Sequence, residues 1–124
     1  MTAKLATRFN CPTEFALDVL GGKWKTVILC YLKYQPLRYA ELRKLLPTLS
    51  DKVLSERLRE LTNKGLISKL QARAGKKNSS TYTLSARGRS LGTLLQELYN
   101  WGESNAAAFG VKVDEPLKRM GYRK

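Results

Sequence analysis

Hydrophobic and polar residues follow one another along this chain with the spacing of several short amphipathic helices. The clearest case is residues 50–65, where Leu54, Leu58 and Leu61 recur at intervals of four and three. Residues at this spacing share one face of an α-helix, so the three leucines are expected to be buried against another element. The opposite face is polar and is formed by Lys52, Glu56, Arg59 and Asn63.

Both ends of this helix carry residues that favour helix termini. Ser50 can cap the N-terminus through its hydroxyl, and Asp51 places a negative charge at the positive end of the helix dipole. At the other end, Lys64 and Gly65 suit a C-terminal turn with a left-handed cap. An ordinary surface helix with a solvated charged face has the same pattern, so the role of this helix depends on its neighbours.

The segments before this helix predict three further helices. Pro12 suits the first turn of a short helix, which a pair of glycines then ends. Residues 23–32 contain six consecutive apolar residues, which fit a buried strand or a buried helix, and the length favours a helix. Residues 37–39 are predicted to form a short strand and residues 39–46 another helix, ended by Pro47. Only a few residues separate it from the helix described first, as in a helix-turn-helix.

The hydrophobic pattern changes after residue 65. Residues 66–72 begin apolar and then alternate, and residues 80–84 are rich in β-branched and aromatic side chains, as strands are. Between them, residues 73–80 combine glycine, serine and asparagine with three positive charges. The segment therefore predicts a hairpin with a long basic tip.

A final helix is predicted from the cap residue Ser85 to about residue 109. Its apolar residues recur at intervals of three and four and form a short, partly coiled-coil-like seam made of Leu91, Leu94, Leu95, Leu98 and Trp101. Residues 1–10 are expected to be an N-terminal arm and residues 110–124 a basic tail. Residues 11–109 are then one α+β, mainly helical domain with the element order of a winged helix-turn-helix and a two-stranded wing.

The net charge of the chain indicates the class of partner, which the hydrophobic pattern alone does not. The chain of 124 residues has 23 lysines and arginines against 10 acidic residues, a formal net charge of +13 that favours an anionic partner. Nucleic acid is the first candidate. A membrane surface is the second, but no long helix is basic on one side and apolar on the other. No apolar run approaches the roughly 20 residues that span a bilayer and no signal-peptide pattern begins the chain, so a cytoplasmic location is expected.

The composition disfavours an enzyme. The chain has no histidine, which removes the commonest general base and most zinc sites. Its two cysteines, Cys11 and Cys30, have neither the spacing of a structural zinc site nor that of a disulfide framework, and Cys30 is expected in the core. Without a phosphate-binding glycine loop or paired carboxylates, no catalytic residue, metal or cofactor is predicted.

A helix-turn-helix with this charge gives the polar face of residues 50–65 a role. A DNA major groove about 12 Å wide accepts a helix, whose outer side chains reach bases or phosphates. The candidate DNA-binding residues of this helix are Ser50, Lys52, Ser55, Glu56 and Arg59, although Glu56 could instead pair with Lys52. In the hairpin tip, Arg73, Lys76 and Lys77 are candidates for phosphate contacts, or they form a solvated loop.

Several motifs resemble the HxlR family of bacterial winged-helix transcription regulators. They cover about residues 11–102 and are C-P at residue 11, L-D-V-L-G-G-K-W-K-T-V-I-L, L-R-Y-A-E-L-R-K-L-L-P, S-D-K-V-L-S-E-R-L-R-E-L-T-N-K-G-L-I, Y-T-L-S-A-R-G and a late Trp101. The resemblance implies a homodimer joined through its first and last helices, the last carrying the seam above, on a pseudo-palindromic DNA operator. It also implies a recognition helix with Ser50, Lys52, Ser55 and Arg59, and a wing with Lys76 and Lys77. The family often has a proline in the wing and an acidic residue just before the tyrosine, and G-K-K-N-S-S-T-Y has neither.

Cys11 is a candidate sensor residue. Some members of the family use the cysteine of the C-P motif to sense electrophiles or oxidants, so the resemblance implies a small-molecule effector of this kind. A thiol at a helix N-terminus near basic residues is also expected to have a lowered pKa. The alternative is that Cys11 is only a small buried apolar residue.

Two functions are compatible with these observations. The first is a dimeric, sequence-specific regulator of transcription that binds double-stranded DNA. The second is a general basic nucleoid-associated or RNA-binding protein, for which the same charge would suffice. The RNA option is weakened because the chain lacks the aromatic-rich strand of an RNA-recognition motif and the loop of a KH domain.

Overall fold

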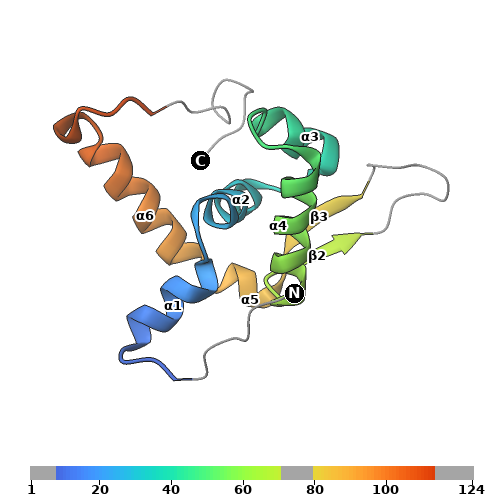
Figure 1. Ribbon diagram of the computed structural model, residues 1–124, viewed down its shortest axis with the longest axis horizontal. Helices are drawn as coiled ribbons and strands as arrows, with labels where there is room; N and C mark the ends of the chain where they lie inside the picture. The colour runs from blue at the N-terminus through green and yellow to red at the C-terminus, as the bar shows by residue number, and fades with distance from the viewer. Residues whose placement is uncertain (1–7, 71–79, 114–124) are drawn as a thin grey trace.

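The computed structural model describes residues 8–70 and 80–113, in which the chain is mainly helical with a small antiparallel sheet (Figure 1). In chain order the elements are α1 (Pro12–Leu20), α2 (Lys23–Tyr34), β1 (Leu37–Arg38), α3 (Tyr39–Leu45), α4 (Asp51–Asn63), β2 (Ile67–Leu70), β3 (Thr81–Leu84), α5 (Ala86–Arg89), α6 (Gly92–Asn105) and the 3-10 turn η1 (Ala107–Phe109). The predicted α+β order of a winged helix-turn-helix is confirmed. Most of the predicted arm and tail lies outside these residues.

The strands form one sheet in the order β1-β3-β2. Strands β2 and β3 pair antiparallel from Ile67 opposite Leu84 to Leu70 opposite Thr81. The short β1 pairs antiparallel with the other edge of β3. The predicted basic tip, with Arg73, Lys76 and Lys77, lies between the ends of this hairpin and outside the described residues.

The hydrophobic core lies among α2, α3, α4 and the sheet. The leucine face predicted for α4 is confirmed, since Leu54 and Leu61 have no exposed surface and Leu58 is 2% exposed. Ile28 and Leu29, in the apolar run within residues 23–32, are also fully buried. This run belongs to α2, a helix that is covered on several sides. The helical interpretation of that run is therefore confirmed.

Helix α4 begins and ends where its capping residues predict. The Ser50 hydroxyl accepts a hydrogen bond from the backbone N–H of Val53 at 3.1 Å. After Asn63 the chain turns at Gly65, whose φ of 74° lies in the left-handed region that glycine adopts without steric cost. The recognition-helix candidate is thus a helix with two defined ends.

The single final helix predicted from Ser85 to about residue 109 is wrong. Ser85 caps only the short α5, and a turn at Ser90 separates α5 from α6. Helix α5 packs against β3 and lies so close to Leu66, the residue before β2, that a Cβ on Gly88 would be 2.0 Å from the Leu66 carbonyl oxygen. Helix α6 instead packs against α2. Because α5 and α6 pack against different elements, the chain turns between them instead of forming one continuous helix.

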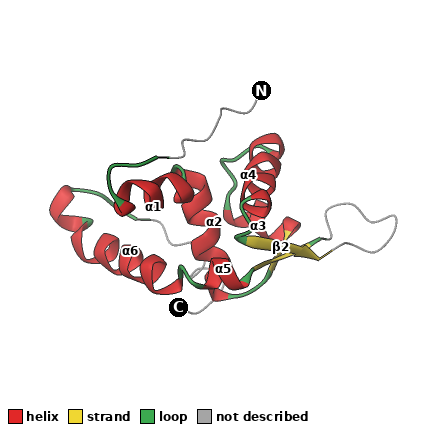
Figure 2. Ribbon diagram, turned by 90° about the horizontal axis from the view of Figure 1, so that it is seen from below, coloured by secondary structure: helices red, strands yellow, loops and turns green. Residues whose placement is uncertain are grey.

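Two sides of the molecule are formed by different helices and strands. Figures 1 and 2 show α4 and the hairpin strands on one side, and α1 and α6 projecting together from the opposite side of α2.

No helix in residues 8–70 and 80–113 has the length and apolar content needed to cross a bilayer.

Candidate nucleic-acid interface

A short turn sets α4 against α3. Residues 46–50 connect the two helices, and the buried side chains of Leu46 and Leu49 hold this turn against the core. The backbone N–H of Leu49 donates to the Leu46 carbonyl at 3.1 Å, which tightens the turn. The leucine face of α4 is then covered, and its polar face points outward.

The predicted DNA-binding residues of α4 differ in exposure. Ser50, Lys52 and Arg59 are exposed, while Ser55 and Glu56 are half-buried. Among the ion pairs found in residues 8–70 and 80–113, none involves Lys52, Glu56 or Arg59. The alternative pairing of Glu56 with Lys52 is therefore absent from this set. Two cations of the outer face, Lys52 and Arg59, remain available for an anionic partner.

Ser50 and Ser55 already make contacts within the protein. The Ser50 oxygen is used as an acceptor by the helix cap, which leaves its O–H as a donor. The Ser55 oxygen lies 3.4 Å from the Tyr39 hydroxyl. Each serine hydroxyl therefore makes a contact within the protein and also lies in the N-terminal half of α4, where it can donate to a partner.

A hollow of about 260 Å³ lies between α4 and the hairpin strands. It brings Ser55 and Arg59 of α4 beside Lys69 of β2, and its remaining lining residues are Leu58, Thr62, Asn63 and Tyr82. Lys69 is exposed and was missed as a candidate in the sequence. The sequence did contain a signal for Lys69. It is a basic residue in the alternating pattern of residues 66–72, on the strand that leads into the wing.

Asp51 links α4 to α3. Its Oδ1 accepts a hydrogen bond from the Tyr39 hydroxyl at 2.7 Å and lies 3.0 Å from Nε of Arg43. Burial raises the pKa of Tyr39, with a smaller contribution from Asp51, so its hydroxyl stays protonated. The first turn of the candidate recognition helix is therefore held by two side chains of the preceding helix.

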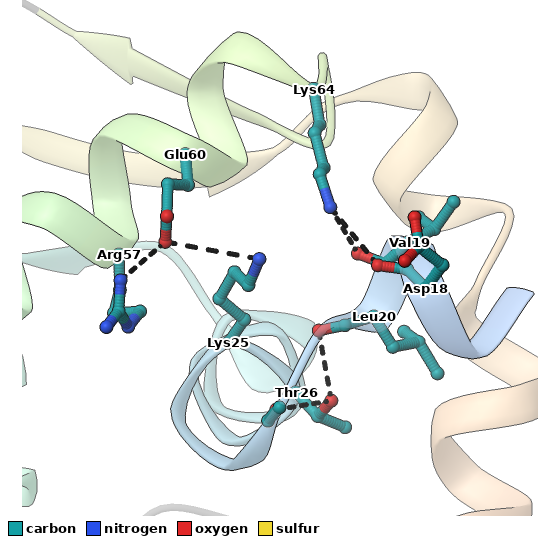
Figure 3. A network of polar contacts seen from close by, with 9 residues as sticks. Asp18, Val19, Leu20, Lys25, Thr26, Arg57, Glu60 and Lys64 are labelled. Carbon is teal, nitrogen blue, oxygen red and sulfur yellow. Dashed lines mark hydrogen bonds and ion pairs between the residues drawn. The ribbon is translucent and has the colours of Figure 1, made fainter. Parts of the chain in front are cut away.

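The C-terminal half of α4 is tied to α1 and α2 (Figure 3). The Lys64 ammonium, just after the helix, donates to the backbone carbonyls of Val19 at 3.1 Å and Asp18 at 3.3 Å. Burial, and then the nearby charge of Lys25, lower the pKa of Lys64. The Glu60 carboxylate lies 2.7 Å from Nη1 of Arg57 and 4.0 Å from Nζ of Lys25. These contacts join the end of α1 to the end of α4.

Cys11 is the N-cap of α1 and is exposed. The backbone N–H of Thr13 donates to its Sγ at 3.4 Å. Hydrogen bonds from the side chain and the backbone of Thr13, and from the backbone of Glu14, lower the pKa of the Cys11 thiol. Cys30 is only half-buried rather than fully in the core. In the part of the chain that the structure describes, no group of three or more Cys, Asp or Glu is placed to hold a metal ion.

The predicted seam on α6 is partly exposed. Leu94, Leu98 and Trp101 are 39%, 47% and 61% exposed, and Leu91 packs partly against the core. Leu95 is only 1% exposed, which corrects its assignment to the dimer interface. Helical periodicity could not separate it from Leu94, because the two neighbours point to different sides of α6. Leu95 belongs to the hydrophobic core of the single chain.

Further exposed apolar residues lie outside this seam, on η1 and on α1. Trp101 contacts the ring of Phe109 with centroids 6.0 Å apart, and Phe109 is itself 69% exposed. On α1, Phe15 and Leu17 are 53% and 64% exposed. Figure 2 shows α1 and α6 on the same side of the molecule, away from α4 and the hairpin strands, so these apolar residues belong to elements on that side.

Comparison with known sequences agrees with this architecture. The sequence profile of the family described as "HxlR-like helix-turn-helix" matches residues 19–109. The chain is 39% identical over 98 residues to the HTH-type transcriptional regulator YtcD of Bacillus subtilis, covering 79% of this chain and 77% of YtcD. It is 38% identical over 96 residues to the HTH-type transcriptional regulator YkvN of the same organism, covering 77% and 80%.

Solved structures show the same fold. The redox regulator HypR in its reduced form superposes with a TM-score of 0.75 at 31% identity, covering 81% of this chain and 98% of HypR. The transcriptional regulator YodB of Bacillus subtilis in its quinone-bound form superposes with a TM-score of 0.62 at 30% identity, covering 76% and 99%. With a family profile that spans most of its length and relatives of this similarity, the chain belongs to the HxlR-like helix-turn-helix family of transcriptional regulators.

Proposed function

We propose that this protein is a homodimeric transcription regulator that binds a pseudo-palindromic operator in double-stranded DNA. The observation that carries the proposal is the exposed polar face of α4, where Lys52 and Arg59 have no ion-pair partner among the described residues. Unpaired cations on the outer face of a helix-turn-helix suit the negative potential of a DNA groove. The net charge of +13 adds a general attraction to DNA.

Each residue of this face has a role in the proposal. Lys52 and Arg59 donate to guanine or to phosphate, and Ser50 and Ser55 donate to phosphate or a base edge near the start of α4. Glu56 accepts from the amino group of cytosine. Lys69 contacts phosphate at the root of the wing, and the basic residues of the wing, Arg73, Lys76 and Lys77, contact the flanking backbone.

The second half of the proposal is the dimer. The exposed apolar side chains of α1 and α6 form a surface that a second copy of the chain would cover, with Leu94, Leu98 and Trp101 at its centre. A two-fold dimer presents two recognition helices, whose half-sites lie about one helical turn apart on DNA. In this proposal, residues 11–109 form one domain that carries both the DNA-binding face and the dimer surface. The protein acts in the cytoplasm, where chromosomal DNA is accessible.

We further propose that Cys11 makes DNA binding responsive to electrophiles. Its lowered pKa increases the fraction of thiolate at neutral pH. The thiolate adds to an electron-poor quinone carbon. A C–S bond forms, the C=C π bond breaks, and its electron pair moves to the quinone oxygen, which takes a proton from water, so no external oxidant is needed. The similarity to the redox regulator HypR and to YodB, which has been solved in quinone-bound form, supports this chemistry.

A selection of bound fragments from random and genomic double-stranded DNA tests the main proposal. The expected result is one preferred sequence with inverted half-sites, bound far more tightly than random duplex. If the selection returns no preferred sequence, or if structured RNA competes as well as duplex DNA, the protein is a general nucleic-acid-binding protein instead.

A further inference from the structure

The orientation of α4 about its own axis decides which side chains face DNA. Its buried leucines pack the helix against the core, but the apolar contacts themselves have no preferred direction. Hydrogen bonds are directional and weaken as their angles change. The polar contacts at both ends of α4 can therefore fix its rotation, and those at its start lie beside the candidate DNA-binding residues Ser50, Lys52 and Ser55.

Those contacts come from two residues of α3 and converge on one carboxylate. Oδ1 of Asp51, the first residue of α4, accepts from the Tyr39 hydroxyl at 2.7 Å and lies 3.0 Å from Nε of Arg43. The Asp51 side chain is 75% exposed, so nothing else in its surroundings holds it by burial. Its position depends on the two donors behind it.

The same two residues also reach the turn before Asp51 and the helix after it. Nη1 of Arg43 donates to the backbone carbonyl of Leu49, in the turn of the helix-turn-helix. The Tyr39 hydroxyl lies 3.4 Å from Oγ of Ser55, one helical turn beyond Asp51. Tyr39 and Arg43 thus contact three successive points of the segment from residue 49 to residue 55.

Charge gives Arg43 a second effect. An uncompensated carboxylate at the outward N-terminal end of α4 would repel the phosphates of DNA, because like charges in partly desolvated contacts are unfavourable. Arg43 lies 3.0 Å from Asp51 and compensates that charge locally. The carboxylate can then serve as an anchor for the helix without opposing DNA binding.

We infer that Tyr39 and Arg43 are positioning residues that determine how well α4 discriminates between DNA sequences, although neither contacts a base. Tyr39 is only 8% exposed and its ring is part of the core, so its hydroxyl acts through Asp51 and Ser55. This inference rests on the proposed binding of a specific operator. It assigns sequence discrimination partly to α3, behind the reading face.

The test compares Tyr39→Phe with the wild-type protein on the selected operator and on random duplex of equal length. The ring stays, so the core is filled, and one directional bond is lost. We expect affinity for the operator to fall by up to about tenfold, because the free energy with which this hydrogen bond held α4 in place must then be supplied by binding. Affinity for random duplex and the slope of affinity against salt concentration should not change, since the phosphate contacts remain.

Two controls separate positioning from general damage. Tyr34→Phe removes a hydroxyl from another tyrosine packed against the core, on α2, and should leave the operator-to-random ratio unchanged. In an Asp51→Ala background, Tyr39→Phe should cost less than in the wild-type protein, because its main acceptor is already gone. Arg43→Lys keeps the charge but cannot hold both acceptors, and should lower the same ratio.

Several outcomes overturn the inference. They are an unchanged ratio in Tyr39→Phe, an equal loss of affinity for operator and random duplex, and the same loss with Asp51 present or absent. If the wild-type protein itself prefers no sequence, the proposed function fails and this inference fails with it. A wild-type preference that Tyr39→Phe leaves intact removes the inference alone.

Discussion

At the scale of single residues, the outer face of α4 separates side chains that are available to a partner from those already engaged. Lys52 and Arg59 are exposed and take part in no ion pair among the described residues, whereas Asp51 is held by two residues of α3. The sequence pattern was sufficient to place Lys52 and Arg59 on the polar face. It could not reveal the bonds of Asp51, because Tyr39 and Arg43 come from another helix.

Arg59 is the residue whose role can be decided most clearly by substitution. If its guanidinium reads a base, Arg59→Ala should cost about 1 to 3 kcal/mol of operator affinity and loosen the preference at one position. Arg59→Lys keeps the charge but loses the two-pronged geometry, so it should lose discrimination while keeping affinity for random duplex. Titration of labelled duplexes measures both, and an unchanged operator affinity in Arg59→Ala would remove this residue from the interface.

Cys11 gives a prediction about pH. Because the folded protein lowers the pKa of this thiol, the thiolate should appear at lower pH than in an unfolded peptide of the same sequence. In a Cys30→Ser background, the rate of alkylation by iodoacetamide should reach half its maximum at a correspondingly lower pH. Thr13→Val removes the side chain that contributes most to the shift and should move the profile back to higher pH.

The functional readout of the same residue is the loss of DNA binding. A quinone should release the wild-type protein from its operator and should not release Cys11→Ser. The sensor proposal does not survive if Cys11→Ser still responds, or if the alkylation profile of the folded protein matches that of the peptide.

At the scale of elements, periodicity and capping residues predicted most of the helices and strands, and they failed where tertiary contacts decide. Ser50 and Gly65 mark the ends of α4 because caps act locally. The division of α5 from α6 has no comparable local signal. It depends on the close approach of Gly88 to the Leu66 carbonyl and on the packing of α6 against α2, and both join segments far apart in the chain.

The close approach of α5 to the Leu66 backbone predicts the effect of adding one methyl group. In Gly88→Ala the new Cβ would lie 2.0 Å from the Leu66 carbonyl oxygen, so the backbone must shift and the free energy of unfolding should fall by about 1 to 3 kcal/mol. Gly92→Ala is the matched control, since its Cβ would meet no atom within 4 Å. Urea unfolding should show that Gly92→Ala is as stable as the wild-type protein or slightly more stable. Equal stability of the two variants would contradict this packing.

At the scale of the whole molecule, the two sides have different chemistry. Figure 1 shows α4 and the hairpin strands on one side of α2, and α1 and α6 on the other. The first side exposes the cations Lys52, Arg59 and Lys69, and the second exposes apolar residues such as Phe15 and Trp101. Lys64 connects the two, since it joins the end of α4 to the carbonyls that end α1 (Figure 3). A chain with this distribution is suited to pairing on one side and binding DNA on the other.

The apolar side predicts the oligomeric state. Leu98→Asp places a charge on the exposed seam of α6 and should weaken self-association at least about tenfold, because a buried leucine contributes about 1.5 to 3 kcal/mol and a buried charge is costly. Leu70→Asp changes an equally apolar residue, 62% exposed on β2, and should leave self-association unchanged. Sedimentation equilibrium measures both. A wild-type protein that stays monomeric at tens of micromolar would rule out the dimer.

We expect the polar face of α4 to read a DNA sequence. The affinity of the wild-type protein for its selected operator and for random duplex, across a series of salt concentrations, measures this directly. We predict a preference of about 10³-fold or more for the operator, with both affinities falling steeply as salt rises. Equal affinity for the two duplexes at every salt concentration would contradict the claim and leave only charge-driven binding.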